Sequence, residues 1–593
     1  GRGKLILIKN SVGKHRLFHI AMKNNGTARI KHIPLWLSII PPLLAIFLAL
    51  VFKEVVISLF IGVWAGAFIT SGLRIESIYY FLLSIFEVVS KFIINALNDS
   101  GHLSVIIFSL LIGGMVAIIS RNGGMAGVVQ SLSRYAKSAR SSQFITWLLG
   151  VAIFFDDYAN TLIVGNTMRS VTDKFKVSRE KLAYIVDSTA APVAAVAFIT
   201  TWIGAELGYI DDGIQMLTGF DAAATPYAIF ISSLKYSFYP VLTLAFILML
   251  VYTKRDFGPM YNAEVRARTT GQVSSTSRDA GESGDLEDLS PVAGAPLKWY
   301  NAVIPVALVI LMTIFGLVDT GMSASYDSLI EMGVNMESRS WGAIWAAMPN
   351  LADNPSFFTK IGTLIGNSDS YVALLWASLS GVIVAIAMTV SARIMKLEQT
   401  INAMITGFKT MLPALIILTL AWSLAITTEE LHTATYLTAS LQDSINPYLM
   451  PAITFVLAAL IAFSTGSSWS TMAILYPIAI PLTWGICQGM EPGISTEILL
   501  NVIATVLAAS VLGDHCSPIS DTTILSSLAS DCNHIDHVRT QLPYALTVGS
   551  VSLVGGTLST FLGGGWLIST AILVVCLGIL FLIATRVGKP VED

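Results

Sequence analysis

The sequence predicts an all-α protein that crosses a membrane about 12 times and consists of two halves with inverted topology. Three observations predict this fold class. Hydrophobic residues make up 54% of the 593 residues, and charged residues only 12%. Apolar stretches of about 20 residues, the length that a helix needs to cross a bilayer, recur along the chain. Two similar polar segments interrupt these stretches, one in each half.

Residues 1–33 precede the first apolar stretch and contain basic residues but no acidic residue. The pieces 3–8 and 15–20 are short and apolar enough to form strands. We interpret 1–33 as a basic N-terminal tail beside the membrane, with a piece of a larger N-terminal domain as the alternative. The four cysteines show no paired spacing, so the sequence predicts no disulfide framework.

The apolar stretches define a first transmembrane half at 34–253, a cytoplasmic linker at 254–298 and a second transmembrane half at 299–593. The linker is rich in Ser, Gly and Thr, which predicts a flexible tether. We predict full spans near 34–52, 54–72, 78–97, 102–120, 181–204, 226–252, 299–319, 369–390, 407–426, 497–525, 543–563 and 566–586.

Loop charges predict the orientation, because Lys and Arg collect on the cytoplasmic side of membrane proteins. The basic loops 121–140 and 169–181 flank one apolar segment, 143–168, which must therefore enter and leave on the cytoplasmic side as a re-entrant hairpin. The acidic loop 205–225 is predicted to be external. Segment 446–483 is predicted to form a second hairpin that enters from outside. Both termini are predicted to be cytoplasmic.

The two halves match in the order of their features. A shift of 309 residues places 102–165 on 411–474 without a gap, and Phe154 on Phe463. The loop charges independently give the halves opposite orientations. Inverted repeats of this kind are the architecture of many secondary transporters.

The polar segments contain the candidate binding residues. The first is Phe-Phe-Asp-Asp-Tyr-Ala-Asn-Thr at 154–161, followed by Asp-Ser-Thr-Ala-Ala-Pro at 187–192. The second is Phe-Ser-Thr-Gly-Ser-Ser-Trp-Ser-Thr at 463–471, followed by Gly-Asp-His-Cys-Ser-Pro-Ile-Ser-Asp-Thr-Thr at 513–523. A carboxylate at membrane depth is costly unless it has a partner, a cavity or a task. The candidate ion- and substrate-binding residues are Asp156, Asp157, Asn160, Thr161, Asp187, Ser188, Thr189, Thr465, Ser467, Ser468, Thr471, Asp514, Ser517, Asp521 and Thr522.

Helix breaks are predicted after each polar segment, at Pro192 and Pro518, because proline removes a backbone donor. Freed carbonyls and a carboxylate could bind a cation or hold a proton. We expect Asp157 rather than Asp156 to face the site, and Asp514 and Asp521 to act as a pair. Each hydroxyl has a structural alternative, since Ser and Thr also join membrane helices by hydrogen bonds.

Other classes of protein are not favoured. No transition metal is predicted, because the spacing of the nearby His and Cys residues fits no zinc site. These residues are His515, Cys516, Cys532, His534 and His537. The sequence contains no Gly-x-Ser-x-Gly, Walker A or Rossmann glycine pattern, so we predict neither an enzyme nor a cofactor. No nucleic-acid partner is predicted. An ion channel would need an open, repeated filter in place of two opposed hairpins.

The string Gly-Asp-His-Cys-Ser-Pro-Ile-Ser-Asp-Thr-Thr at 513–523 resembles the signature of the NhaC sodium/proton antiporter family. The segments 155–160 and 464–472 are similar to that family as well. The resemblance implies the fold of the ion transporter superfamily, elevator-like movement, and Na⁺ and H⁺ as the ions transported at the candidate residues.

The resemblance also implies a prokaryotic plasma (inner) membrane as the location. The lipid bilayer, sodium ions and protons would be the partners, and a homodimer stays open. Relatives in the family exchange malate and protons for lactate and sodium, and others move amino acids. Exchange of small organic acids or amino acids is therefore the alternative to sodium/proton exchange.

Overall fold

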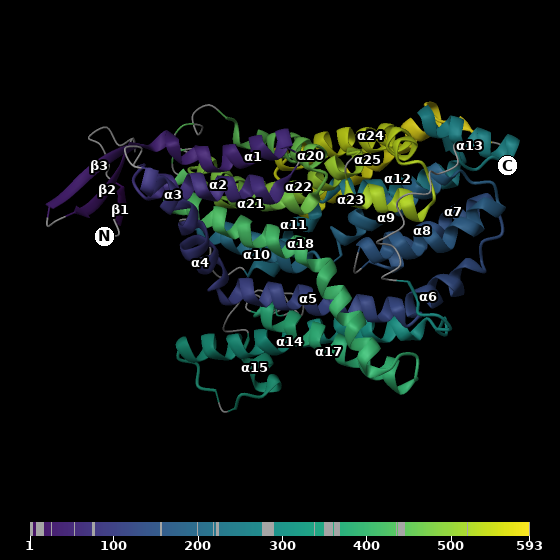
Figure 1. The fold of residues 1–593 in the computed structure, drawn as a ribbon, viewed down its shortest axis with the longest axis horizontal. Helices are drawn as coiled ribbons and strands as arrows, with labels where there is room; N and C mark the ends of the chain where they lie inside the picture. Colours follow the sequence, from purple (N-terminus) through teal and green to yellow (C-terminus); the bar gives the residue numbers. More distant parts are fainter. Residues whose placement is uncertain are drawn as a thin grey trace.

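The computed structural model of the protein is helical almost throughout the residues that it describes (Figure 1). These residues are 4–7, 17–24, 27–52, 54–73, 78–154, 157–197, 200–217, 219–220, 225–275, 290–336, 338–348, 360, 364, 368–433, 436, 440, 445–518 and 520–591.

The N-terminal segment forms an antiparallel three-stranded sheet in the order β1-β2-β3. The strands are β1 (Lys4–Leu7), β2 (Leu17–Asn24) and β3 (Thr27–Pro34). The strands predicted at 3–8 and 15–20 are thus confirmed, with β3 in addition. In Figure 1 the sheet projects from the opposite end of the molecule to β5 (Lys589–Pro590). The membrane side of each end stays a prediction from the loop charges, since no membrane is present.

The first half continues from the sheet through helices of very different length. They are η1 (Leu35–Ile39), α1 (Ile40–Phe52), α2 (Val55–Thr70), α3 (Ile78–Glu87), η2 (Val88–Ile93), α4 (Ile94–Leu97), α5 (Ser100–Arg121), α6 (Gly124–Ser133), α7 (Ala139–Ala152), α8 (Asp157–Lys174), α9 (Arg179–Ala194), α10 (Ile203–Gln215), α11 (Pro226–Ser233), η3 (Leu234–Tyr236) and α12 (Phe238–Thr253).

The second half follows the linker. The remaining elements are β4 (Arg255–Asp256), α13 (Gly258–Thr270), α14 (Tyr300–Glu331), α15 (Trp341–Ala347), α17 (Ser370–Ser391), α18 (Leu397–Glu430), η5 (Pro447–Leu449), α20 (Met450–Thr465), α21 (Ser468–Ile486), α22 (Pro492–Cys516), α23 (Asp521–Ala529), α24 (His534–Phe561) and α25 (Gly565–Arg586). The short strands β4 and β5 pair with each other.

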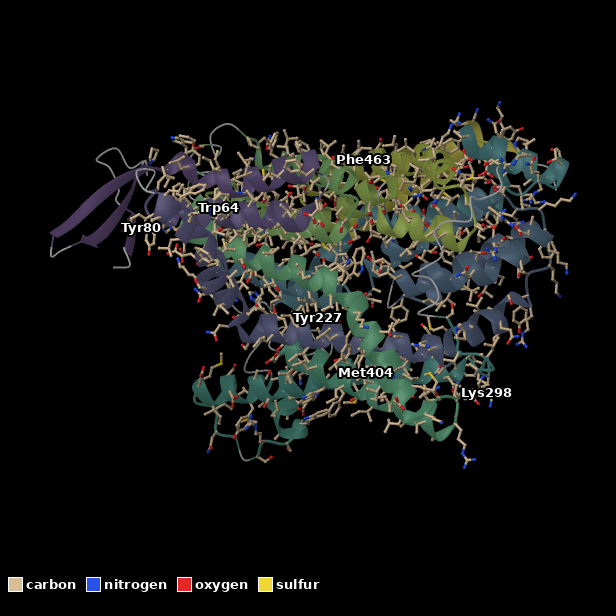
Figure 2. All side chains as sticks on the ribbon, in the orientation of Figure 1. Trp64, Tyr80, Tyr227, Lys298, Met404 and Phe463 are labelled. Atoms are coloured by element: carbon tan, nitrogen blue, oxygen red, sulfur yellow. The ribbon has the colours of Figure 1, made fainter. Side chains whose placement is uncertain are left out.

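Within the described residues, 10 helices are long and apolar enough to cross a membrane, or 11 with the pair 226–236 and 238–253, which is bent by 49°. Apolar side chains, including Phe463, cover the outside of the bundle (Figure 2), as a lipid-facing surface requires. The chain is therefore a multi-pass membrane protein, as predicted.

Several predicted spans differ from the structure. The spans 34–52 and 54–72 are shorter apolar helices, Leu35–Leu48 and Val56–Thr70. The predicted span 181–204 is broken after Ala194, two residues beyond Pro192. Conversely, the segment 446–483 is predicted to be a re-entrant hairpin, but each of its two helices is long and apolar enough to cross a membrane. The break after Ala194 follows Pro192, and Gly466 separates the two helices of 446–483, since both residue types can interrupt the backbone hydrogen bonds of an apolar stretch.

The two halves repeat the same order of elements. A helical pair, α7–α8 or α20–α21, is followed by a broken helix, α9–α10 or α22–α23. In Figure 1, α7 and α8 lie toward one end of the bundle and α20 and α21 toward the other. In each half, the second piece of the broken helix packs on the helical pair of the other half. Helix α10 contacts α21, and α23 contacts α8. Since no membrane is present, the side from which each pair enters stays a prediction.

The acidic segment 205–225 is not simply an external loop, because it begins within α10. Glu206 is buried there, and Tyr476 of α21 donates a hydrogen bond of 3.2 Å to its Oε1. Helix α10 therefore contributes to the contact between the halves.

The linker is more ordered than a flexible tether. Helix α13 packs on α9 and α24, with Met260 and Glu264 buried, and Val292 N donates to Arg121 O at 2.9 Å. The prediction of a tether is wrong for 258–275. Residues 276–289 lie outside the described part of the chain.

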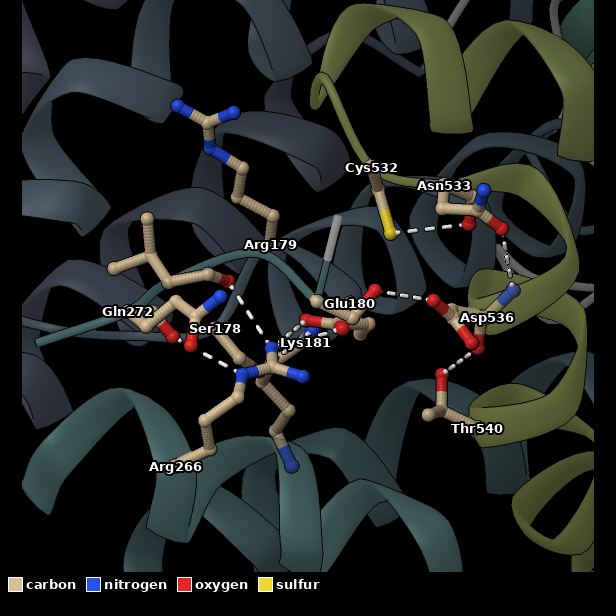
Figure 3. A network of polar contacts seen from close by, with 12 residues as sticks. Ser178, Arg179, Glu180, Lys181, Arg266, Gln272, Cys532, Asn533, Asp536 and Thr540 are labelled. Atoms are coloured by element: carbon tan, nitrogen blue, oxygen red, sulfur yellow. Dashed lines mark hydrogen bonds and ion pairs between the residues drawn. The ribbon is translucent and has the colours of Figure 1, made fainter. Parts of the chain in front are cut away.

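Charged contacts hold α13 in place (Figure 3). Arg266 Nη2 lies 2.9 Å from both carboxylate oxygens of Glu180. Ser178 N donates to Glu264 Oε1 at 2.7 Å, and Arg268 pairs with Glu264 at 3.1 Å. Burial raises the pKa of the Glu264 carboxyl, and the Arg268 guanidinium opposes this shift. These contacts attach the linker to the beginning of α9.

Candidate functional site

The first helical pair approaches α9 closely at Gly150. A Cβ on Gly150 would lie 2.0 Å from Thr189 Oγ1, so only glycine permits this approach. Asn160 of α8 then joins all three helices, because its Nδ2 donates to Gly150 O at 2.7 Å and to Thr189 O at 3.1 Å. The beginning of α8, with Asp157 buried in its first turn, is thereby fixed beside α9.

The second helical pair turns at Gly466, which ends α20 in the left-handed conformation with φ of 67°. Ser467 caps α21 by accepting from Ser470 N at 3.4 Å. Ser468 follows in the first turn, and its hydroxyl donates to Asp514 Oδ2 at 3.2 Å. The turn therefore brings α21 to the carboxylate near the end of α22.

The first turn of α23 connects the aspartates of the two halves. Thr522 Oγ1 donates to Asp514 Oδ2 at 3.2 Å, and its neighbour Thr523 donates to Asp187 Oδ2 at 3.1 Å. Asp187 and Asp514 are almost completely buried, at 0% and 1% exposure. Partial positive charge at the beginning of α23 favours negative charge on both aspartates.

Asp187 has only neutral hydrogen-bond donors among the described residues. Its Oδ2 also accepts from Gln541 Nε2 of α24 at 2.6 Å. Its Oδ1 is buried without a hydrogen-bond partner in this part of the chain. A buried carboxylate oxygen without a partner is costly. Binding of a proton or a metal cation would remove that cost, so Asp187 is the clearest candidate ligand.

Four predicted hydroxyls instead bond to the backbone of their own helix. Thr161, Thr189, Thr465 and Thr471 donate to Asp157 O, Ile185 O, Ile461 O and Ser467 O, at 2.8, 2.8, 2.9 and 3.1 Å. This arrangement matches the structural alternative for these hydroxyls.

The remaining predicted residues lie near the same helix ends. Ser188 is buried next to Asp187, and Ser517 is the C-cap of α22. Asp156 lies outside the described residues, and so does the side chain of Asp521, which begins α23. The predicted pairing of Asp514 with Asp521 therefore stays a prediction.

Sequence reasoning missed Thr523 and Gln541 as partners of Asp187. Thr523 ends the string 513–523, so its position gave a signal. Gln541 gave none, because 354 residues separate it from Asp187. The histidines considered for zinc form no metal-ligand group with other described residues; His515 O instead accepts from Gln541 Nε2 at 2.8 Å.

The opposed helical pairs, the broken helices and the buried carboxylates define a secondary transporter of the inverted-repeat class. The fold is similar to that of the YdaH transporter of Alcanivorax borkumensis, with a TM-score of 0.51 and 13% identity. That similarity covers 81% of this chain and 89% of the YdaH chain.

The model of the Na+/H+ antiporter family matches residues 193–558, more than half of the chain, and the chain belongs to this family. An uncharacterized protein of Haemophilus influenzae is 31% identical over 520 residues, which cover 87% of this chain and 89% of that protein. The chain is thus a secondary antiporter, as its sequence predicts.

Shorter similarities involve two antiporters of stated substrate. The arginine/ornithine antiporter ArcD of Halobacterium salinarum is 40% identical over 110 residues, 18% of this chain and 21% of ArcD. The malate-2H(+)/Na(+)-lactate antiporter of Bacillus subtilis is 27% identical over 124 residues, 21% of this chain and 24% of that protein.

Proposed function

We propose that the protein exchanges sodium ions for protons across a prokaryotic plasma membrane, with Asp187 and Asp514 as the coupling carboxylates. The observation that carries the proposal is the junction at Thr522 and Thr523, where buried aspartates of both halves meet one helix N-terminus. Sodium prefers oxygen ligands, and half-helix ends provide such sites in transporters.

The chemistry of exchange follows from competition at these carboxylates. A buried carboxylate is stable with a bound proton or beside a cation, but not as an isolated charge. Loss of the proton would create the counter-charge for sodium, and loss of sodium would favour return of the proton. One site that accepts either ion, but not both, couples their opposite movements.

The test is sodium-driven proton flux in proteoliposomes that contain no organic solute. Asp187→Asn and Asp514→Asn should each abolish this flux, because an amide provides neither the negative charge nor the proton site. Asp157→Asn is expected to have the same effect if Asp157 faces the ions. Asp327→Asn is the matched control, since the Asp327 side chain is 66% exposed. Normal flux in Asp187→Asn and Asp514→Asn would refute the proposed coupling.

Exchange of small organic acids or amino acids is the second candidate. The partial similarity to the two solute antiporters favours it. Helices α21 and α23 begin at the serine caps Ser467 and Ser520, and helix N-termini attract carboxylates. Proton flux that requires internal malate, lactate, arginine or ornithine as well as sodium would support this candidate over simple ion exchange.

A further inference from the structure

A chain of hydrogen bonds leads from Asp187 to two histidines at the beginning of α24. Gln541, which donates to Asp187, lies with its Oε1 3.0 Å from His537 Nε2. His537 Nδ1 lies 2.8 Å from Ser527 Oγ, and His534 Nδ1 lies 3.0 Å from the same oxygen. The chain thus connects a fully buried carboxylate to His534, which is partly exposed.

The partners fix which nitrogen of each histidine carries hydrogen. Gln541 Nε2 faces two acceptors, Asp187 Oδ2 and His515 O, so the amide oxygen must face His537. His537 Nε2 therefore donates to Gln541. His534 Nε2 lies 2.6 Å from Pro518 O, a carbonyl that only accepts, so this nitrogen also carries hydrogen.

One hydrogen is missing when both histidines are neutral. A neutral imidazole has only one N–H, so His534 and His537 would each present a bare Nδ1 to Ser527. The single hydroxyl hydrogen of Ser527 would then have three acceptors, since Thr523 O lies 2.7 Å away as well. It can satisfy only one of the two imidazoles.

One added proton completes the arrangement. With a proton on Nδ1, His534 donates to Ser527 Oγ, and Ser527 then donates to His537 Nδ1. We propose that His534, Ser527 and His537 form a proton-binding site that holds one proton between two imidazoles and acts on Asp187 through Gln541. Nothing in the sequence motifs or the family match assigns such a site. Its link to transport rests on the proposed sodium/proton exchange.

The surroundings limit what this proton does. Gln541 is an amide and a poor proton carrier, so the site acts on Asp187 by charge rather than by direct transfer. Positive charge on the histidines attracts the Asp187 carboxylate, and the Gln541 dipole is aligned between them. The other charged and titratable groups on the surrounding elements include Asp157, Arg169, Asp173 and Lys174 of α8, Arg179, Glu180, Lys181 and Tyr184 of α9, Glu264, Arg266 and Arg268 of α13, Asp514, His515 and Cys516 of α22, Asp531 and Cys532 before α24, and Asp536, Arg539 and Tyr544 of α24.

Histidine ¹⁵N NMR of the purified protein tests the site without transport. At about pH 7.5, where an ordinary histidine is neutral, the wild type should show a signal from one doubly protonated imidazole of this site. His534→Gln and His537→Gln should each lack this signal. Ser527→Ala should abolish it as well, because the bridge is removed. His432→Gln is the control and should leave it unchanged.

His102 provides an internal reference. Its two ring nitrogens face Ala96 O at 2.7 Å and Asp212 Oδ1 at 3.0 Å, so it should give a second doubly protonated signal that all these variants retain. The proposal would be overturned if His534 and His537 both gave neutral imidazole signals at about pH 7.5, and if each variant lost only the signal of its own histidine.

Transport provides the second measurement. Ser527→Ala should shift the midpoint of the pH profile of sodium-driven proton flux upward by about one unit, because the positive charge that favours the Asp187 carboxylate is lost. An unchanged profile would refute the link to Asp187. If the wild type shows no sodium-driven flux but keeps the shared-proton signal, the proposed function fails while the proton site stands.

Discussion

Gln541 of α24 donates a hydrogen bond of 2.6 Å to Asp187 of α9, and both side chains are fully buried. The contact joins the two halves of the protein at the candidate site. It also orients Asp187 Oδ2 toward Thr523, while Oδ1 is buried without a hydrogen-bond partner among the described residues. Several consequences of this arrangement can be measured.

Gln541→Leu should lower the free energy of unfolding by about 1.5–3 kcal/mol, because a hydrogen bond to a charged group is lost. Sodium-driven flux should fall with it, since Asp187 loses its position. Thermal unfolding in detergent and flux in proteoliposomes measure the two effects. Gln488→Leu is the control because Gln488 is exposed. Equal losses of stability and flux in Gln541→Leu and Gln488→Leu would contradict the contact between Gln541 and Asp187.

Sodium should stabilise the protein more strongly at high pH than at low pH. If protons and sodium compete for Asp187 and Asp514, protonation at low pH removes the sodium site. The apparent affinity for sodium then rises up to tenfold per pH unit as protons leave. Sodium at about 100 times its dissociation constant adds about 2.7 kcal/mol of stability.

The measurement is the melting temperature with and without sodium between about pH 6 and 9. Asp187→Asn should reduce the dependence on pH, and Asp327→Asn should retain it. The same sodium effect at every pH in the wild type would show that the ions do not compete, and would favour a sodium-coupled carrier of another solute.

The contact between α8 and α23 depends on Gly165. A Cβ on this residue would lie 2.6 Å from Ala529 Cβ, so Gly165→Ala should destabilise the protein by about 1–3 kcal/mol through overpacking. The exchange Gly165→Ala with Ala529→Gly should recover most of the loss. Gly578→Ala is the control, since nothing lies within 4 Å of its added Cβ. Failure of the double variant to recover would mean that the two helices do not meet at these residues.

The two helical pairs should be accessible from opposite sides of the membrane. Lys137, before α7, and Gln488, after α21, are both exposed. In a cysteine-free background, Lys137→Cys should react with an impermeant thiol reagent from the cytoplasmic side only, and Gln488→Cys from the external side only. Labelling of both residues from one side would contradict the predicted inverted entry.

Arg266 should stabilise the attachment of the linker. Arg266→Met leaves the Glu180 carboxylate, which is 2% exposed, without its partner and should cost about 3–5 kcal/mol. Adding Glu180→Gln should recover part of this loss, because the unpaired charge is removed. Arg339→Met is the control, since the Arg339 side chain is 59% exposed. A loss in the control as large as in Arg266→Met would argue against the specific contact.

The sequence alone determined the membrane class, the two repeated halves and the helix breaks near Pro192 and Pro518. These features depend on local composition, and a bilayer imposes the same length and polarity rules wherever an apolar segment occurs. The sequence also predicted Asp187, Asp514 and Thr522 as candidate residues, since a polar residue in an apolar segment is visible without any knowledge of packing.

Only the tertiary structure decided which polar groups meet. Gln541 and Asp187 are far apart in sequence, and Thr465 and Thr471 resemble site hydroxyls until their helix contacts are known. The ordered part of the linker was missed for a related reason. Its Ser, Gly and Thr content suggested a tether, whereas the buried pairing of Arg266 with Glu180 forms only when α13 packs on α9.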